Sequence, residues 1–107
     1  MISTHILDTS LGLPAAGVEV KLLRREGETW RELDSGATNL DGRFAFNCQN
    51  VAGSYQIVFS IEEYFKKASR ESFFMNTPVL FKVVETNKKY HVPLLLNPFG
   101  YSTYRGS

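Results

Sequence analysis

The sequence lacks the features that several classes of protein require. Cysteine occurs once, at Cys48, so no disulfide can form within the chain, and a reducing compartment suits it. No apolar run is long enough to cross a membrane, and residues 1–5 lack the basic and apolar regions of a signal peptide. The sequence therefore predicts a cytoplasmic protein without a membrane anchor.

An excess of charge of one sign is also missing. The 107 residues include 12 Lys and Arg against 11 Asp and Glu, interspersed along the chain, for a net charge of +1. Nucleic-acid binding requires a clustered basic face, so we do not expect a nucleic-acid partner. Two histidines alone make a poor metal site, since structural zinc has four ligands. The length fits one domain that covers residues 1–107.

Short runs with an alternation of two dominate the chain and predict β-strands. Tyr55, Ile57 and Phe59 share one face of the run 53–59, and Phe44 and Phe46 share one face of 43–48, so that Arg43 points the other way. The remaining expected strands cover residues 3–9, 18–22, 30–38, 79–83, 92–96 and 101–104. Short strands separated by turns predict an antiparallel β-sandwich of about seven to eight strands.

Local signals add detail to this outline. Ser60 and Glu63 fit a capping box, which predicts a helix of about two turns with Ile61, Tyr64, Phe65 and Ala68 on its apolar side. Residues 24–28 are expected to form a charged hairpin loop, Gly36 a bulge, and Asp41-Gly42 a hairpin turn.

The end of the chain is unusual in composition. Residues 92–96 are apolar at every position, which predicts a strand covered on both faces. Pro93 restricts this strand to a sheet edge, or to a position where its N–H is not needed. The chain then ends on aromatic residues, Arg105, Gly106 and Ser107, where most domains have a frayed polar tail. We expect this end to be held against the domain.

Few side chains are suited to catalysis. His5, Arg43, His91 and Arg105 are the candidates, and each taken alone is more often an ordinary surface or strand residue. Cys48 is expected to pack as a small hydrophobic residue. Periodicity and spacing alone thus indicate a β-sandwich whose function stays open.

Three motifs resemble those of the 5-hydroxyisourate hydrolases, the enzymatic members of the transthyretin-like proteins. The motifs are STHILDT at residues 3–9 with GLPAAGV at 12–18, TNLDGR at 38–43, and HVPLLL through PFGYSTYRGS at 91–107. The resemblance extends over nearly the whole chain, and residues 62–77 are its least constrained part. The final Tyr-Arg-Gly-Ser distinguishes the family's enzymes from its hormone carriers.

This resemblance implies a fold, an assembly and a reaction. It implies a transthyretin-like sandwich with one short helix, four chains assembled as a dimer of dimers, and active sites in the cleft between dimers. The substrate would be 5-hydroxyisourate, opened by water at a ring amide to give 2-oxo-4-hydroxy-4-carboxy-5-ureidoimidazoline in urate degradation, without a cofactor. The implied catalytic residues are His5, Arg43, His91 and Ser107, and the implied substrate-binding residues are His5, Arg43, Tyr104 and Arg105.

The residue types agree with this chemistry. Opening a cyclic amide requires an activated water and a group that stabilises an oxyanion. A guanidinium disfavours the cationic form of a nearby imidazole, so a histidine beside Arg43 stays neutral and can act as a base. We assign the base to His5 and His91 jointly, and expect Ser107 to orient rather than attack.

Two other functions compete with this one. A non-enzymatic, transthyretin-like carrier would bind an aromatic ligand in the same cleft, and would be expected to lack the histidines, Arg43 and the Tyr-Arg-Gly-Ser end. A metal-storing sandwich would bind zinc between histidines of facing subunits.

Overall fold

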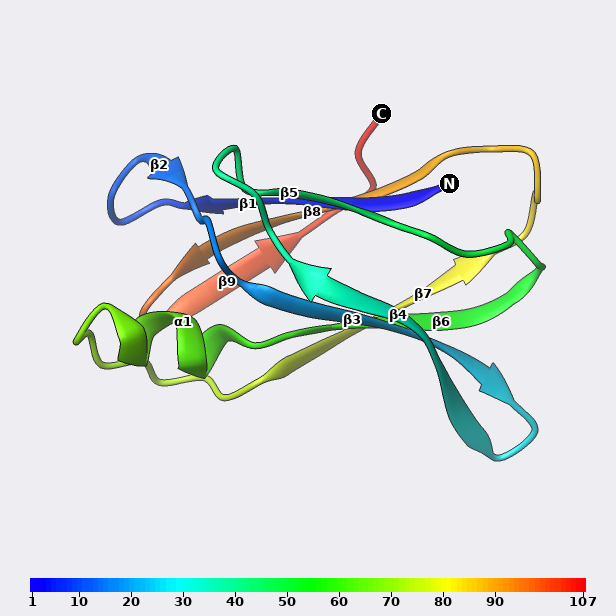
Figure 1. Cartoon of the computed structure of the whole chain (residues 1–107), viewed down its shortest axis with the longest axis horizontal. Helices are drawn as coiled ribbons and strands as arrows, with labels where there is room; N and C mark the ends of the chain where they lie inside the picture. The colour runs from blue at the N-terminus through cyan, green and yellow to red at the C-terminus, as the bar shows by residue number, and fades with distance from the viewer.

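Two β-sheets pack face to face in the computed structural model, which describes residues 1–107 (Figure 1). The first sheet contains β1 (Ile2–Asp8), β2 (Leu13–Pro14), β5 (Arg43–Phe46), β8 (Tyr90–Asn97) and β9 (Gly100–Thr103). The second contains β3 (Glu19–Glu26), β4 (Thr29–Ala37), β6 (Gly53–Phe59) and β7 (Thr77–Val83), in the order β4-β3-β6-β7. One helix, α1 (Ile61–Lys67), follows β6. The predicted β-sandwich with one short helix is confirmed, and the two-residue β2 is the strand that the sequence did not predict.

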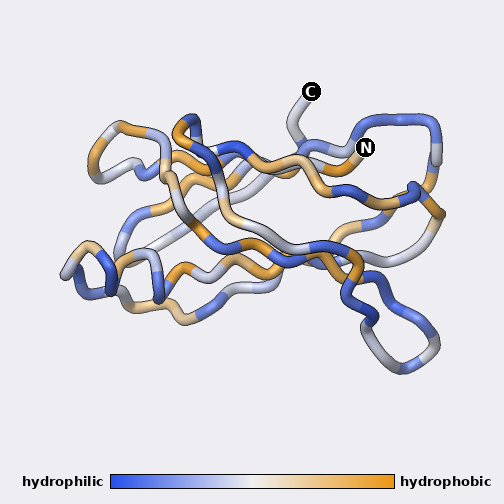
Figure 2. The backbone as a smooth tube through the Cα atoms, viewed as in Figure 1, coloured by the Kyte–Doolittle hydropathy of each residue, from blue (hydrophilic) through white to orange (hydrophobic).

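The core lies between the sheets and contains 17 buried hydrophobic residues. Tyr55, Ile57 and Phe59 of β6 are fully buried, as their alternation predicts. On β1 the even-numbered residues from Ile2 to Asp8 are buried and the odd-numbered residues are half-buried. Figure 2 shows hydrophilic residues at the end of the β3–β4 hairpin and in the loop before β8, away from this core. The inward direction of the even-numbered residues therefore places Ser3 and His5 on the outer face of the first sheet.

Strand β8 lies inside its sheet and not at an edge. It pairs in parallel with β1 and antiparallel with β9, so the sandwich is not antiparallel throughout. Parallel neighbours need a long connection, and here almost the whole chain provides it. Of the two positions expected for Pro93, the sheet edge is not the one that it occupies. The alternative fits, because the pairing with β9 begins only at Leu94, opposite Thr103, and leaves Pro93 beyond it. Covering on both faces is only partial, since Leu95 is half-buried.

The β3–β4 hairpin differs from its prediction in two respects. Strand β3 continues to Glu26, so the predicted loop at 24–28 is reduced to a turn at Gly27 and Glu28. The bulge is not at Gly36 but at Leu33, the extra residue opposite Leu22 and Leu23. Gly36 has another reason to be glycine, since a Cβ there would lie 2.3 Å from Cε1 of Phe44.

Helix α1 begins where predicted but without a capping box. The Ser60 side chain forms no capping hydrogen bond, and its backbone (φ −81°, ψ 66°) departs from the extended conformation that an N-cap usually adopts. The Ser60 N–H instead donates to the Glu19 carbonyl (2.9 Å), which fixes the chain against the start of β3. Ile61 and Phe65 are buried as predicted, whereas Ala68 is exposed at the C-cap.

A buried carboxylate connects the end of β1 to the segment around the helix. Asp8 is fully buried and accepts hydrogen bonds from Arg70 Nη1 (2.8 Å), the Tyr64 hydroxyl (2.9 Å) and the Ser10 N–H (3.1 Å). Burial by itself would raise the pKa of Asp8, but the bonds from Arg70, Ser10 and Tyr64 and the charge of Arg70 lower it from 3.8 to about 2. Burial and the bond to Asp8 also raise the pKa of Tyr64 to about 12.

We predict that Asp8→Asn destabilises the protein by about 3 kcal/mol, because it leaves the Arg70 charge without its buried partner. The lowered pKa of Asp8 means that its contribution is fully present above pH 3.8 and is lost as the pH falls through about 2. Urea unfolding of the wild type and of Asp8→Asn between pH 7 and pH 2 measures the difference in the free energy of unfolding. The exposed pair of Lys88 with Glu85 provides the control, and Glu85→Gln is expected to change stability by at most about 0.5 kcal/mol. Equal stability of Asp8→Asn and the wild type at pH 7 would show that the network is dispensable.

Candidate active site

His5 and Arg43 lie opposite each other on the outer face of the first sheet. The antiparallel register of β1 and β5 pairs the two residues directly. Cross-strand partners have Cβ atoms about 5 Å apart and project to the same side, so imidazole and guanidinium are neighbours. Phe46 is buried and Arg43 is exposed, which confirms the predicted direction of the Arg43 side chain.

The turn at residues 39–42 sets the position of Arg43. The Asn39 side-chain oxygen accepts the N–H groups of Asp41 (2.9 Å) and Arg43 (3.0 Å). Gly42 has a positive φ of 74°, and a Cβ there would lie 2.5 Å from the carbonyl oxygen of Ile6. The turn was predicted correctly, but it is not a hairpin, because it carries the chain from β4 in one sheet to β5 in the other.

His91 joins this pair through the parallel register of β1 and β8. Its neighbour on β1 is Ser3, whose hydroxyl oxygen lies 2.9 Å from His91 Nδ1. Burial lowers the pKa of His91, and electrostatic repulsion of its cationic form by Arg43, with a smaller effect from His5, lowers it further. The imidazole is therefore held in the neutral form that can accept a proton.

The C-terminal tail runs antiparallel to β8 beside His91. The Gly106 N–H donates to the His91 carbonyl (2.8 Å), and the Thr103 hydroxyl donates to the Pro93 carbonyl (2.7 Å). A Cβ on Gly106 would lie 2.6 Å from His91 Cδ2, so only glycine permits this approach. The expectation that the chain end is held against the domain is confirmed.

A concavity of ≈ 290 Å³ on this face, which we call the His91 hollow, contains three of the predicted catalytic residues. Arg43, His91 and Ser107 all line it, and His5 adjoins it through its pairing with Arg43. Ser3 lines it as well and was not predicted. The full lining is Met1, Ser3, Thr4, Arg43, Phe44, Ala45, Lys89, His91 and Ser107.

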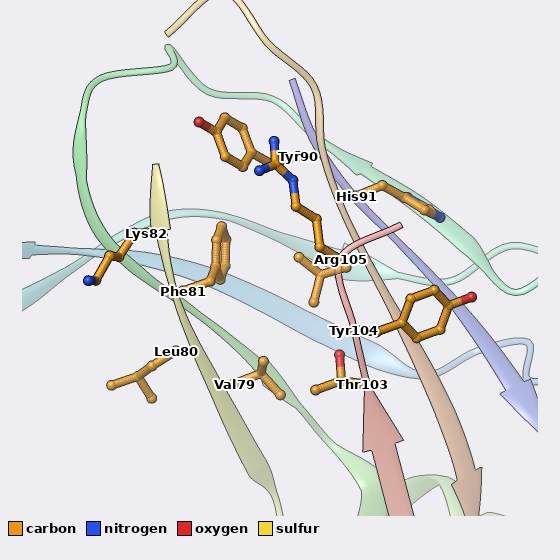
Figure 3. Close-up of a pocket in the computed structure, with 10 residues that line it drawn as sticks. Val79, Leu80, Phe81, Lys82, Tyr90, His91, Thr103, Tyr104 and Arg105 are labelled. Carbon is orange, nitrogen blue, oxygen red and sulfur yellow. The ribbon is translucent and has the colours of Figure 1, made fainter. Parts of the chain in front are cut away.

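Tyr104 and Arg105 line a second concavity of ≈ 370 Å³, the edge groove, which lies between β7 and the ends of β8 and β9. Figure 3 shows Arg105 extended toward Tyr90, with Tyr104 on the other side of the tail, toward His91. The Arg105 Cζ lies 4.8 Å from the centre of the Tyr90 ring, a cation–π distance. His91 lines both concavities, so the two predicted substrate-binding residues of the tail are adjacent to the His91 hollow without entering it.

The remaining features of the structure do not add a metal centre. No group of three or more His, Cys, Asp and Glu residues is placed to hold a metal ion. No helix is long and apolar enough to span a bilayer. Cys48 is half-buried against the core, as predicted, and burial raises the pKa of its thiol. The outer face of the first sheet thus combines two histidines with a guanidinium. The neutral imidazole of His91 can serve as a base, and the guanidinium of Arg43 can stabilise an anion.

Comparison with known proteins places this arrangement in a family. A 5-hydroxyisourate hydrolase of Salmonella dublin is 44% identical over 110 residues, which cover 100% of this chain and 81% of that protein. The structure of Klebsiella pneumoniae 5-hydroxyisourate hydrolase has a TM-score of 0.86 and 42% identity, over 99% of this chain and 98% of the other. Transthyretin from Sparus aurata has a TM-score of 0.92 but only 26% identity, over 98% and 95% of the two chains.

The fold is therefore common to enzyme and transthyretin, and sequence identity is what separates them. The model of the HIUase/Transthyretin family matches residues 2–106. This chain belongs to the HIUase/Transthyretin family.

Proposed function

We propose that this protein is a 5-hydroxyisourate hydrolase, in which water attacks a ring amide and gives 2-oxo-4-hydroxy-4-carboxy-5-ureidoimidazoline. The observation that carries the proposal is the His91 hollow, where His91, Arg43 and Ser107 come together from three separate parts of the chain, with His5 adjoining. The identity to named hydrolases over the full chain supports the same reaction.

The reaction needs a base, and a neutral imidazole of the His5–His91 pair performs this role. It removes a proton from water while the water oxygen bonds to the carbonyl carbon of the ring. The ring C–N bond then breaks, and the imidazolium returns the proton to the departing nitrogen. No electrons are gained or lost and no cofactor takes part. The surroundings of His91 favour the neutral form at the start of the cycle.

Arg43 stabilises the negative charge that develops on the carbonyl oxygen. Its guanidinium is permanently charged and planar, and its fork of N–H groups matches the edge of a flat, carbonyl-rich ring. Its exposed position opposite His5 leaves these donors available to a ligand. Ser107 orients the substrate or the attacking water, because Gly106 brings it beside His91. Tyr104 and Arg105 hold the far end of the substrate, where the edge groove meets the His91 hollow.

The active unit is a homotetramer, a dimer of dimers, in the cytoplasm, and each chain contributes one domain of residues 1–107. Val92, Leu94 and Leu96 are buried within the chain, so this apolar run gives no argument for assembly. Phe99 and Tyr101 do, since they are 70% and 39% exposed. Strands β7 and β9 are also unpaired sheet edges in the single chain, and another copy can cover them.

A transthyretin-like carrier is the alternative. The close match to the backbone of transthyretin does not favour it, because the fold serves both functions. Measuring the decay of 5-hydroxyisourate distinguishes the two functions, since a carrier binds an aromatic ligand without consuming 5-hydroxyisourate.

We predict that the protein accelerates the loss of absorbance of freshly generated 5-hydroxyisourate. His5→Ala, Arg43→Ala and His91→Ala are each expected to lower kcat by at least about 100-fold, because each removes a proton-transfer or charge-stabilising group. Gel filtration and circular dichroism should show unchanged assembly and folding. Glu85→Gln serves as the active control. If the wild type does not accelerate the decay of 5-hydroxyisourate but binds an aromatic ligand, the hydrolase proposal is refuted and the carrier is favoured.

We predict a rate that falls only when the pH drops below about 6.5, the ordinary histidine pKa, because the pKa of His91 is lowered and its neutral form persists to lower pH. Arg43→Gln removes one of the positive charges that lower the His91 pKa, so that pKa should rise. NMR titration of the imidazole measures the change independently of activity. Arg25→Gln, on the distant hairpin, is the control. An unchanged His91 pKa in Arg43→Gln would show that the two groups do not interact.

We predict that deletion of residues 104–107 abolishes hydrolysis and leaves the tetramer intact, because these residues approach His91 and contribute Ser107 to the hollow. A C-terminal tag should impair the enzyme far more than an N-terminal tag. The three proteins are compared for 5-hydroxyisourate decay and by gel filtration. Full activity after truncation would show that the tail is not part of the site. A monomeric wild type at micromolar concentration would contradict an assembly with active sites in the cleft between dimers.

A further inference from the structure

One hydrogen bond distinguishes the two histidines of the site. The Ser3 hydroxyl oxygen lies 2.9 Å from Nδ1 of His91, whereas His5 takes part in no side-chain hydrogen bond. Ser3 is half-buried on β1, directly opposite His91 on β8 and Ala45 on β5. Strands on both sides therefore fix its backbone, and its hydroxyl can act as a rigid partner for the ring.

The tail restrains the opposite edge of the same ring. Gly106 comes so close that a Cβ there would lie 2.6 Å from His91 Cδ2 and 3.3 Å from Cγ. The imidazole is thus held at Nδ1 by Ser3 and at Cδ2 by the tail. Nε2 is the ring nitrogen that remains without a protein hydrogen-bond partner. Because His91 lines the His91 hollow, we take Nε2 as the atom available to a ligand there.

The hydroxyl can pair with Nδ1 in two ways, with opposite consequences. If Ser3 donates to Nδ1, the proton of the neutral ring is on Nε2, and the ring cannot accept a proton there. If Ser3 accepts from Nδ1–H, the lone pair is on Nε2, the nitrogen without a protein partner. Only the second arrangement makes His91 a base toward a bound water.

Building on the proposed hydrolase, we propose that Ser3 is a positioning residue that accepts the Nδ1–H of His91 and so fixes Nε2 as the basic nitrogen of the site. Ser3 acts through the imidazole and forms no bond to substrate. His91 is then the general base of the pair, and His5 is left to bind substrate and to disfavour the cationic form of His91. The arrangement resembles that of histidines elsewhere whose second nitrogen is fixed by a hydrogen-bond acceptor.

The tautomer is measured directly by nitrogen NMR of the imidazoles, in the tetramer without substrate at pH 7. The His91 signals are identified by their loss in His91→Ala. We expect a protonated Nδ1 and an unprotonated Nε2 in the wild type, and a mixture of tautomers in Ser3→Ala. An unprotonated Nδ1 in the wild type would overturn the proposal, and so would an unchanged tautomer in Ser3→Ala. The NMR measurement of the tautomer does not depend on enzymatic activity.

Kinetics of the same variants give the second test. Ser3→Ala should lower kcat by about 10-fold to 100-fold, the range observed when metal-bound histidines lose the partner of their second nitrogen. KM should stay within about twofold, because no substrate contact is lost. Ser3→Thr keeps a hydroxyl at the same atom and should restore most of the rate. Ser54→Ala, an exposed strand serine of the other sheet, is the matched control.

The outcomes separate the two proposals. A wild type that shows the expected tautomer but does not consume 5-hydroxyisourate would refute the hydrolase and leave the Ser3–His91 bond standing. An active enzyme in which Ser3→Ala keeps full kcat would refute the role of Ser3 and leave the hydrolase standing. A rise in KM alone would show that Ser3 contacts substrate and does not act through His91.

Discussion

The parallel pairing of β1 with β8 is the constraint on which the site depends. It places Ser3 beside His91 and His5 beside Pro93, and so joins residues 88 positions apart in the chain. Because side chains alternate across a strand, the same pairing buries Ile2 and Ile6 and leaves Ser3 and His5 half-buried on the outer face. A slip of one residue would exchange the two faces, moving His5 into the core and Ile6 onto the surface. The packing of the hydrophobic core therefore fixes the geometry of the proposed catalytic residues.

Two further features refine this geometry. The turn at Asn39 and Gly42 delivers Arg43 opposite His5, and the tail delivers Ser107 beside His91. Both approaches need glycine, at Gly42 against the backbone of β1 and at Gly106 against the imidazole. Within this cluster, burial and the electrostatic effects of Arg43 and His5 favour a neutral His91. Positioning and electrostatics thus come from the same few contacts, which β1, β5, β8 and the C-terminal tail form together.

The strands were predictable because their signal is local. The run Gly53–Phe59 was predicted with the correct bounds from its alternation, and the same rule gave the outward direction of Arg43. The bulge at Leu33, the interior place of Pro93 and the bond from Arg70 to Asp8 were not predicted, since each depends on how a residue meets another strand or segment and not on the local pattern. The same holds for Ser3, because no local pattern reveals its register with His91. The site residues themselves were predicted from motifs shared with a known family. The fold explains only how these residues come close together in space.

The central claim is that His5 and His91 belong to one catalytic unit. A double-mutant cycle with His5→Ala, His91→Ala and the double variant, assayed for 5-hydroxyisourate decay, tests it most directly. If the two residues act as a unit, the double variant should lose little more activity than the worse single variant. If the two losses multiply, the histidines act independently, and a single site built by the pairing of β1 with β8 is contradicted.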